Sequence, residues 1–131
     1  MVIGNGCRRE ILPGRVTVDK SRYGKYPILR SDLRGVGLTK VSIPEENCEE
    51  AIELARAACD ALKCDDHVRI DMREGADGKL RIMEVNGIPG LKPVKSWSPQ
   101  IYALYHPCAD PYAALIGTIV SGALERQNGR K

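Results

Sequence analysis

Apolar and polar residues alternate along residues 67–90 in the pattern of a β-hairpin. Val68, Ile70 and Met72 alternate with polar residues, which is the two-residue period of a half-buried strand. Residues 75–78, Gly-Ala-Asp-Gly, supply turn formers, because glycine adopts positive φ freely and aspartate can bond its own backbone. On a return strand over about residues 79–86, one face is expected to carry Leu80, Ile82, Glu84 and Asn86, and the other Arg81, Met83 and Val85.

The polar face of this hairpin collects groups that suit a divalent cation. Asp71 lies two residues after Arg69, and Glu84 lies two residues before Asn86, so each pair shares a face. Neighbouring carboxylates repel each other, and Mg²⁺, which prefers oxygen ligands, relieves that repulsion. Two interpretations are open at this level. One is a Mg²⁺ site that also takes phosphate oxygens, with Arg69 beside it to stabilise an oxyanion. The other is a solvated polar face with weak ion pairs.

The helical period appears in three later stretches. Serine, proline and glutamate at positions 42, 44 and 45 form a helix-start signal, and apolar residues then recur every three or four positions to about residue 63. The glutamates of this helix are expected to form a solvated face without chemistry. A short helix is predicted over about residues 99–105, and a last helix after Asp110-Pro111.

The remaining strands are short. One is expected at residues 1–5 and another over about residues 11–18, where Pro13 implies an edge position or a bulge. Residues 19–41 are basic with little periodicity and are interpreted as a long loop, with a short strand at about residues 26–29. The order of elements favours one α+β domain over residues 1–131, with a largely antiparallel sheet and helices packed on one face.

Composition argues against several functional classes. The net charge is only +3, and the basic residues are scattered and not interleaved with aromatics, so no nucleic acid partner is expected. No apolar run reaches the length of a membrane span, and residues 1–4 show neither a basic leader nor an apolar signal core, which favours a cytoplasmic protein. The five cysteines include no C-x-x-C pair and are expected to be reduced thiols, several of them in the core.

Two short runs, Arg69-Ile-Asp71 and MEVNGIPG at residues 83–90, together resemble the signature of the D-alanine–D-alanine ligase family and its ATP-grasp relatives. In that family an R-x-D strand is followed by an E-x-N strand and a Pro-Gly turn. The resemblance extends weakly across nearly the whole chain. It implies the carboxy-terminal subdomain of an ATP-grasp domain, without the nucleotide-clamping first half or the amino-terminal substrate domain.

The resemblance implies a role for each matching residue. Asp71, Glu84 and Asn86 would bind the Mg²⁺ (or Mn²⁺) ions that bridge the phosphates of ATP, so Glu84 and Asn86 would also serve the nucleotide. Arg69 would be the catalytic residue that steadies a tetrahedral intermediate. Gly90 would offer its backbone to the same oxyanion or to the substrate.

Further assignments depend on less specific matches. The family closes a lysine loop over the nucleotide phosphates, and Lys25 is the best candidate for that lysine, with Lys20 next; the alternative is that these lysines only add charge to a loop. A serine or basic residue after the glycine holds the substrate carboxylate in the family, and Ser96 and Lys95 are the nearest matches. Trp97 is expected to pack in the core or to wall the substrate pocket.

The implied function is part of an ATP- and Mg²⁺-dependent carboxylate–amine ligase for small amino acids, most like D-alanine–D-alanine ligase of peptidoglycan biosynthesis, acting through an acyl phosphate. Because half of the grasp is missing, the isolated chain is expected to show little or no turnover without that half or a partner chain. The alternative is a non-catalytic metal-binding or protein-interaction module derived from such a ligase.

Overall fold

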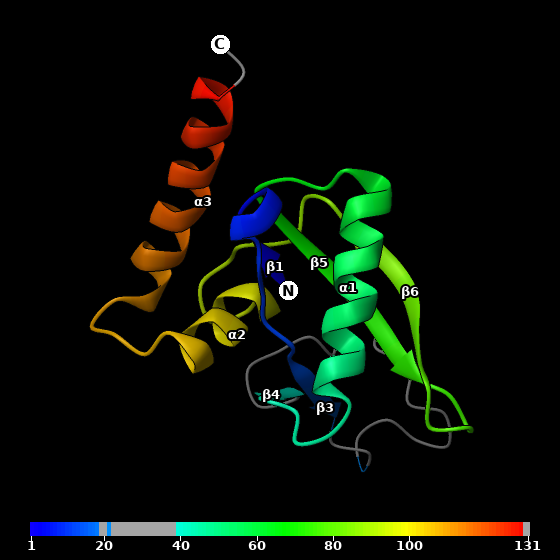
Figure 1. The fold of residues 1–131 in the computed structure, drawn as a ribbon. Coiled ribbons are helices and arrows are strands. Elements are labelled where there is room, and N and C mark those ends of the chain that lie inside the picture. The colour runs from blue at the N-terminus through cyan, green and yellow to red at the C-terminus, as the bar shows by residue number, and fades with distance from the viewer. Residues whose placement is uncertain (19–20, 22–38, 130–131) are drawn as a thin grey trace.

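A four-stranded antiparallel sheet forms the centre of the protein. The computed structural model describes residues 1–18, 21 and 39–129. The strands lie in the order β2-β1-β5-β6, and each neighbouring pair is antiparallel (Figure 1). They are β1 (Val2–Ile3), β2 (Glu10–Ile11), β5 (His67–Glu74) and β6 (Leu80–Asn86). The long β5–β6 hairpin, predicted from the alternating pattern, is therefore confirmed and forms one side of the sheet.

The single strand predicted over about residues 11–18 is in fact two strands in two different sheets. β2 ends before Pro13, and β3 (Arg15–Val18) pairs with β4 (Thr39–Ser42) in a separate two-stranded sheet. Proline has no N–H to donate and so interrupts a ladder. The carbonyl of Pro13 accepts a hydrogen bond of 2.8 Å from the hydroxyl of Tyr105, the last residue of α2 (Trp97–Tyr105). This hydrogen bond attaches the segment between β2 and β3 to α2.

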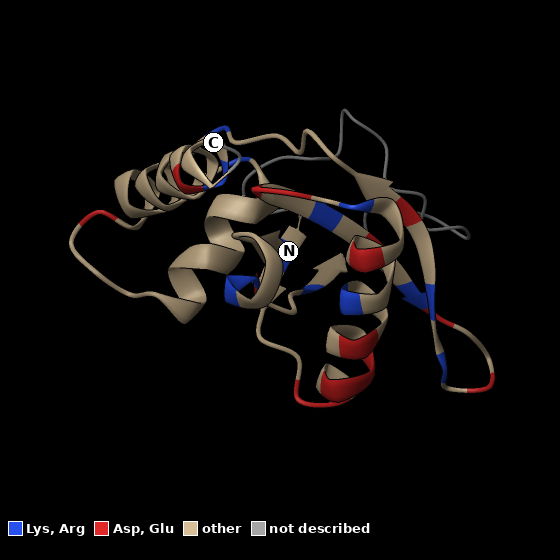
Figure 2. Cartoon of the chain, turned by 45° about the horizontal axis from the view of Figure 1, so that its top comes forward, with Lys and Arg blue, Asp and Glu red and all other residues tan. Residues whose placement is uncertain are grey.

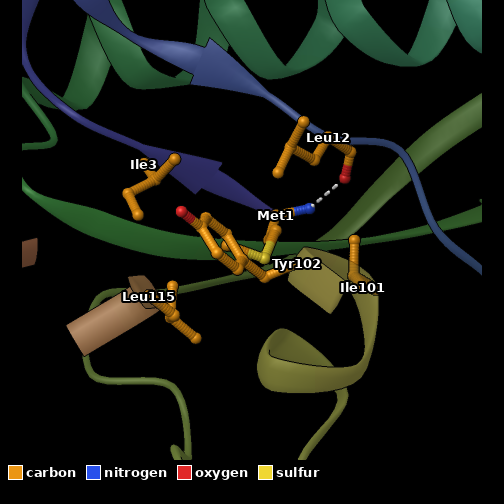
Figure 3. Packing of buried hydrophobic residues seen from close by; sticks show 6 residues of the cluster. All are labelled: Met1, Ile3, Leu12, Ile101, Tyr102 and Leu115. Atoms are coloured by element: carbon orange, nitrogen blue, oxygen red, sulfur yellow. Dashed lines mark hydrogen bonds between the residues drawn. The ribbon is translucent and has the colours of Figure 1, made fainter. Parts of the chain in front are cut away.

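Helices lie on both sides of the sheet. Val2 and Ile3 point to opposite faces, because side chains alternate along a strand. Val2 is buried with residues of β5 and of α1 (Cys48–Leu62) in the cluster Val2, Ala55, Cys59 and Val68. Ile3 is buried with residues of α2 and α3 (Pro111–Asn128) in the cluster of Figure 3, which comprises Met1, Ile3, Leu12, Ile101, Tyr102 and Leu115.

These two clusters show on which faces of the sheet the helices pack. The α+β class and the largely antiparallel sheet are confirmed. The helices were expected on one face, whereas α1 covers one face and α2 with α3 the other. The physical reason is that β1 is apolar at both of its positions, so it can be buried only if both faces are covered.

α1 begins later than the sequence predicted. Ser42, the expected cap, is the last residue of β4 and pairs with Arg15 in the small sheet, so it does not start the helix. The chain turns into α1 at Asn47, whose φ is 59°. Figure 2 shows acidic positions along α1. One of these acids is not merely solvated, because the Leu80 N–H donates to Glu50 Oε1 at 3.2 Å and ties α1 to β6.

The last two helices start close to their predicted positions. α2 begins at Trp97, two residues before the expected start. The start of α3 at Asp110-Pro111 is confirmed, since the Asp110 carboxylate accepts a hydrogen bond of 2.9 Å from the Ala113 N–H. None of the helices in the described part of the chain combines the length and the apolar character that a membrane crossing needs.

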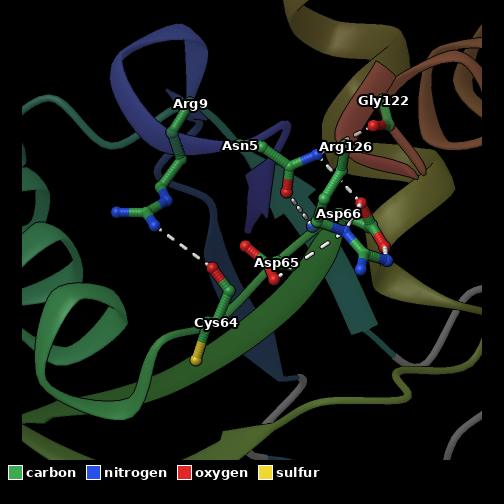
Figure 4. Close-up of polar contacts among 7 residues, drawn as sticks. All are labelled: Asn5, Arg9, Cys64, Asp65, Asp66, Gly122 and Arg126. Carbon is green, nitrogen blue, oxygen red and sulfur yellow. Dashed lines mark hydrogen bonds and ion pairs between the residues drawn. The ribbon is translucent and has the colours of Figure 1, made fainter. Parts of the chain in front are cut away.

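A polar network joins α3 to the turn after β1 and to the residues before β5 (Figure 4). The Asn5 side chain accepts from the Asp66 N–H at 2.7 Å and donates to Asp66 Oδ1 at 2.9 Å. It also donates to the Gly122 carbonyl at 3.0 Å. Arg126 donates to Asp66 Oδ2 at 2.5 Å. α3 has one fully buried residue, Leu115, and this network adds polar contacts that attach the helix near its other end.

Replacing Asn5 with alanine is expected to lower the free energy of unfolding by about 1–3 kcal/mol, because the three hydrogen bonds are partly buried and all three partner groups, two on Asp66 and one on Gly122, lose a bond. Arg8→Ala is the matched control. Its ion pair with Glu125 also reaches α3, at 2.8 Å, but both side chains are largely exposed, so a loss of no more than ~0.5 kcal/mol is expected. Urea denaturation measures both variants, and equal losses would contradict this account of α3.

Candidate functional site

The register of the β5–β6 hairpin brings the predicted polar residues onto one face. Asp71 is directly opposite Glu84, and Arg69 is directly opposite Asn86. Directly opposed residues in an antiparallel pair share a face, with Cβ atoms about 4.5–5.5 Å apart. Since His67 is opposite Ile3 and lies two positions before Arg69, this polar face is on the same side of the sheet as α2.

A β-bulge changes the rest of the expected face. The register shifts between Asp71 and Met72, so that Met72 is opposite Ile82 and Met83 has no directly opposed partner. The prediction that Leu80 and Ile82 share a face with Glu84 is therefore wrong. The extra residue at Met83 reverses the alternation, and Ile82 lies instead on the side of Met72, towards α1. The bulge lies between the hairpin turn and the polar residues, so the pairs Arg69–Asn86 and Asp71–Glu84 keep their register.

Arg69 is held by two groups. Its Nε and Nη2 donate to the two oxygens of Asp71 at 2.7 and 2.8 Å, which is a bidentate pair. This hydrogen bond raises the pKa of Arg69 above its ordinary value. The guanidinium carbon also lies 5.1 Å from the centroid of the Trp97 ring, within range of a cation–π interaction. The Arg69 side chain is only 14% exposed, so these contacts hold a largely covered charge.

The acids and the amide of the site have unequal surroundings. Glu84 is exposed, whereas Asp71 and Asn86 are half-buried. The Asn86 side-chain oxygen accepts a hydrogen bond of 3.1 Å from the Ile88 N–H, which stabilises the turn that ends β6. A carbonyl oxygen has a second lone pair, so Asn86 can still accept a further donor or a cation.

The donor set can be compared with what a metal ion requires. In the described ranges, no three His, Cys, Asp or Glu side chains gather as a group that could hold a metal ion. The candidate ligands are two carboxylates and one amide, from Asp71, Glu84 and Asn86. Mg²⁺ commonly takes one or two carboxylates and completes its octahedron with waters and substrate phosphates. These residues therefore fit Mg²⁺, on condition that Asp71 shares its oxygens between the cation and Arg69.

The two predicted substrate-binding residues lie side by side in the loop after β6. A Cβ built on Gly90 would be 3.0 Å from the Ser96 hydroxyl oxygen, so glycine permits this close approach. The Ser96 hydroxyl accepts from the Lys92 N–H at 3.0 Å and closes the loop. At its tip, Val94 has a φ of 64°, a strained value for a β-branched residue. The predicted lysine-loop candidates, Lys25 and Lys20, lie outside the described residues.

Sequence reasoning missed His67, which lies two residues before Arg69 on the same face. The residue is 7% exposed, and its Nε2 is buried without a hydrogen-bond partner in the described residues. Burial lowers the pKa of His67 to about 4, and the positive charges of the Met1 amine and Arg69 contribute to the shift. A histidine at the start of an apolar strand beside an arginine was the only signal in the sequence.

This depressed pKa predicts a loss of stability in acid. An unfolded His67 has an ordinary pKa near 6.5, so between about pH 6.5 and pH 4 the unfolded chain binds a proton that the folded chain does not. The contribution of His67 should therefore fall by about 3 kcal/mol as the pH is lowered from 7 to 4. Urea denaturation of the wild type and of His67→Leu across this range isolates the effect, and parallel stability curves would contradict it.

Comparison with known proteins finds a family model and several relatives that match this chain. The family model described as D-ala D-ala ligase C-terminus matches residues 1–104. The D-alanine–D-alanine ligase of Pseudarthrobacter chlorophenolicus is 32% identical over 130 residues, covering 96% of this chain and 33% of that relative. The D-alanine–D-alanine ligase of Geobacillus thermodenitrificans is 28% identical over 130 residues, covering 99% of this chain and 34% of that relative. The chain thus spans about one third of the length of the curated relatives it matches.

Proposed function

The chain belongs to the D-ala D-ala ligase C-terminus family, and from that premise we propose that it forms part of an ATP- and Mg²⁺-dependent carboxylate–amine ligase. The substrates of such an enzyme would be small amino acids, as in D-alanine–D-alanine ligase. In this proposal the chain corresponds to the carboxy-terminal subdomain of an ATP-grasp domain. It would contribute metal-binding and oxyanion-binding groups to an active site that other parts of the ligase complete.

One observation carries the proposal: the cross-strand pairing of Asp71 with Glu84 and of Arg69 with Asn86. A solvated face would need no particular register, and two acids side by side cost free energy through their repulsion. A divalent cation bound between them would offset that repulsion. The same four residues carry the family signature, so geometry and sequence support the same site.

Each residue has a distinct task in this scheme. Asp71, Glu84 and Asn86 would hold Mg²⁺, which when bound orients the ATP phosphates and offsets their charge during transfer to the substrate carboxylate. Arg69 would face the oxyanion that develops when the amine attacks the resulting acyl phosphate. Gly90 and Ser96 would hold the substrate through the backbone and the hydroxyl of one tight loop. Lys25, which lies outside the described residues, would contact the phosphates.

Exposed apolar side chains favour a part of a larger enzyme over an autonomous module. Met83, Ile88 and Val94 are 67%, 93% and 68% exposed, and all three lie on β6 or in the loop that follows it. Large apolar groups exposed beside a polar site are typical of a surface that another domain covers. We therefore expect the isolated chain to bind Mg²⁺ and nucleotide weakly and to show little or no turnover. The non-catalytic module derived from a ligase is the alternative.

Two measurements, made one after the other, test the proposal. Paramagnetic Mn²⁺, used in place of Mg²⁺, should broaden the amide NMR signals of Asp71, Glu84 and Asn86 before all others. The chain should then be mixed with the complementary part of a related D-alanine–D-alanine ligase, D-alanine and ATP. Phosphate release that requires D-alanine and both polypeptides would support the ligase, whereas Mn²⁺ binding without any release in the mixture would favour the module.

A further inference from the structure

The guanidinium of Arg69 contacts two partners on different elements, Asp71 on its own strand and Trp97 at the start of α2. Its N–H edge donates to both oxygens of Asp71, at 2.7 and 2.8 Å. Its charge also lies 5.1 Å from the centroid of the Trp97 ring. A carboxylate accepts in the plane of a guanidinium, whereas an aromatic ring interacts with its flat face. One contact can therefore be lost while the other remains.

The contact with Asp71 conflicts with the proposed metal site. Both oxygens of Asp71 accept hydrogen bonds from Arg69, and a divalent cation needs at least one of them. The cation would also repel the positive guanidinium. An Arg69 held only by Asp71 would thus be released from its position when the metal binds, although the proposed chemistry needs it in place at that time.

Trp97 belongs to a helix that is anchored away from the polar site. It is the first residue of α2, and Ser98, Pro99, Ile101 and Tyr102 behind it are all buried. Trp97 itself packs against the cluster of Met1, Ile3, Leu12, Ile101, Tyr102 and Leu115. At the other end of α2, the Tyr105 hydroxyl donates to the Pro13 carbonyl. The ring therefore provides a surface whose position does not depend on whether a cation is bound.

We infer that Trp97 is a positioning residue for Arg69: its ring holds the guanidinium over the polar face when Asp71 turns to a cation. This role of Trp97 in catalysis rests on the proposed function. The contact between Trp97 and Arg69 can be tested without metal or nucleotide. Trp97 lies seven residues beyond the Pro-Gly turn and is the only tryptophan of the chain. A variant at this position therefore removes the whole tryptophan signal as well as the contact.

The decisive measurement is the NMR signal of the Arg69 Nε–Hε group in the Asp71→Asn variant, which removes the charge of the ion pair and leaves at most one acceptor oxygen for Arg69, without any metal. The ring current of Trp97 is expected to displace this signal in the wild type and should still do so in the variant. Adding Trp97→Leu should remove the displacement and speed exchange of the proton with water. Loss of the displacement in Asp71→Asn alone would overturn the inference, because the ring would then not hold the guanidinium unaided.

Three controls keep the result interpretable. Arg69→Lys identifies the signal by removing it. The Nε–Hε signal of Arg81, whose ion pair with Asp77 at the hairpin turn measures 2.8 Å, should not respond to Trp97→Leu. Trp97→Phe, which keeps an aromatic face, should retain a reduced displacement, and it supplies the comparison if Trp97→Leu does not fold.

Titration with Mg²⁺ separates this inference from the proposed function. In the wild type, Mg²⁺ should shift the amide signals of Asp71, Glu84 and Asn86 while Arg69 keeps its ring-current displacement. A spectrum that Mg²⁺ does not change would count against the metal site alone, since the Asp71→Asn comparison still decides the role of Trp97. Movement of the Arg69 signal to the position seen in Trp97→Leu would overturn the positioning role.

Discussion

Replacing Asp71 with asparagine or Glu84 with glutamine is expected to abolish the Mg²⁺-dependent binding of nucleotide. The two acids are directly opposed across the hairpin, and each would supply a negatively charged oxygen to the cation. An amide offers a neutral oxygen of nearly the same shape, so each variant removes charge with little change of volume. Isothermal titration with a non-hydrolysable ATP analogue, with and without Mg²⁺, measures the loss.

The matched control is Glu74→Gln on the same strand. Glu74 is also exposed, but it lies three residues after Asp71 on β5 and is opposite Leu80, so alternation along the strand puts it on the other face from the Asp71–Glu84 pair. Its carboxylate accepts a 3.4 Å hydrogen bond from Asn47 and is not expected to contribute to the metal site. Binding should therefore stay within about twofold of the wild type.

Asp71→Asn also weakens the ion pair with Arg69, so by itself it could act through the arginine. No side-chain hydrogen bond of Glu84 is found in the described part of the chain, and its charge is the last of the causes that raise the pKa of Arg69, so Glu84→Gln disturbs the arginine less than Asp71→Asn does. A loss in Asp71→Asn but not in Glu84→Gln would point to Arg69 and would contradict a metal shared by both carboxylates. Unchanged binding in both variants would remove the basis of the proposed function.

The parts of the fold that could be predicted are those set by local sequence. The hairpin follows from a two-residue apolar period and a Gly-Ala-Asp-Gly turn, and the start of α3 follows from Asp110 followed by proline. The hairpin and the start of α3 both depend on residues that are close together in the sequence. The common face of Arg69 and Asp71 follows from the same period. The family resemblance, carried by these residues, is confirmed by the match to residues 1–104.

The parts that could not be predicted depend on pairing between distant residues. Nothing in the run LRIMEVN marks Met83 as a bulge, because its alternation reads as regular until the partner strand is known. Ser42 resembles a helix cap, but its pairing with Arg15 makes it the end of a strand instead. The contact between Arg69 and Trp97 depends on how α2 packs on the sheet, which no local pattern specifies.

Leu115→Ala is expected to lower the free energy of unfolding by about 2–5 kcal/mol. Leu115 is fully buried, with an exposed fraction of 0%, and it packs with Ile3 of β1 and with Ile101 and Tyr102 of α2. Truncation removes apolar burial and leaves a cavity between helix and sheet that the antiparallel framework can close only in part. Urea denaturation monitored by circular dichroism measures the loss.

Leu124→Ala is the control within the same helix, because Leu124 is 54% exposed and should cost less than about 1 kcal/mol. Hydrogen exchange then shows where the lost stability acts. Since Leu115 is the only buried residue of α3, its truncation should accelerate exchange in α3 first, while the amides of the β5–β6 hairpin follow only the global decrease. Uniform acceleration in helix and hairpin would instead mean that α3 is integral to the core. In that case the Asn5–Asp66–Arg126 network would add little to its attachment.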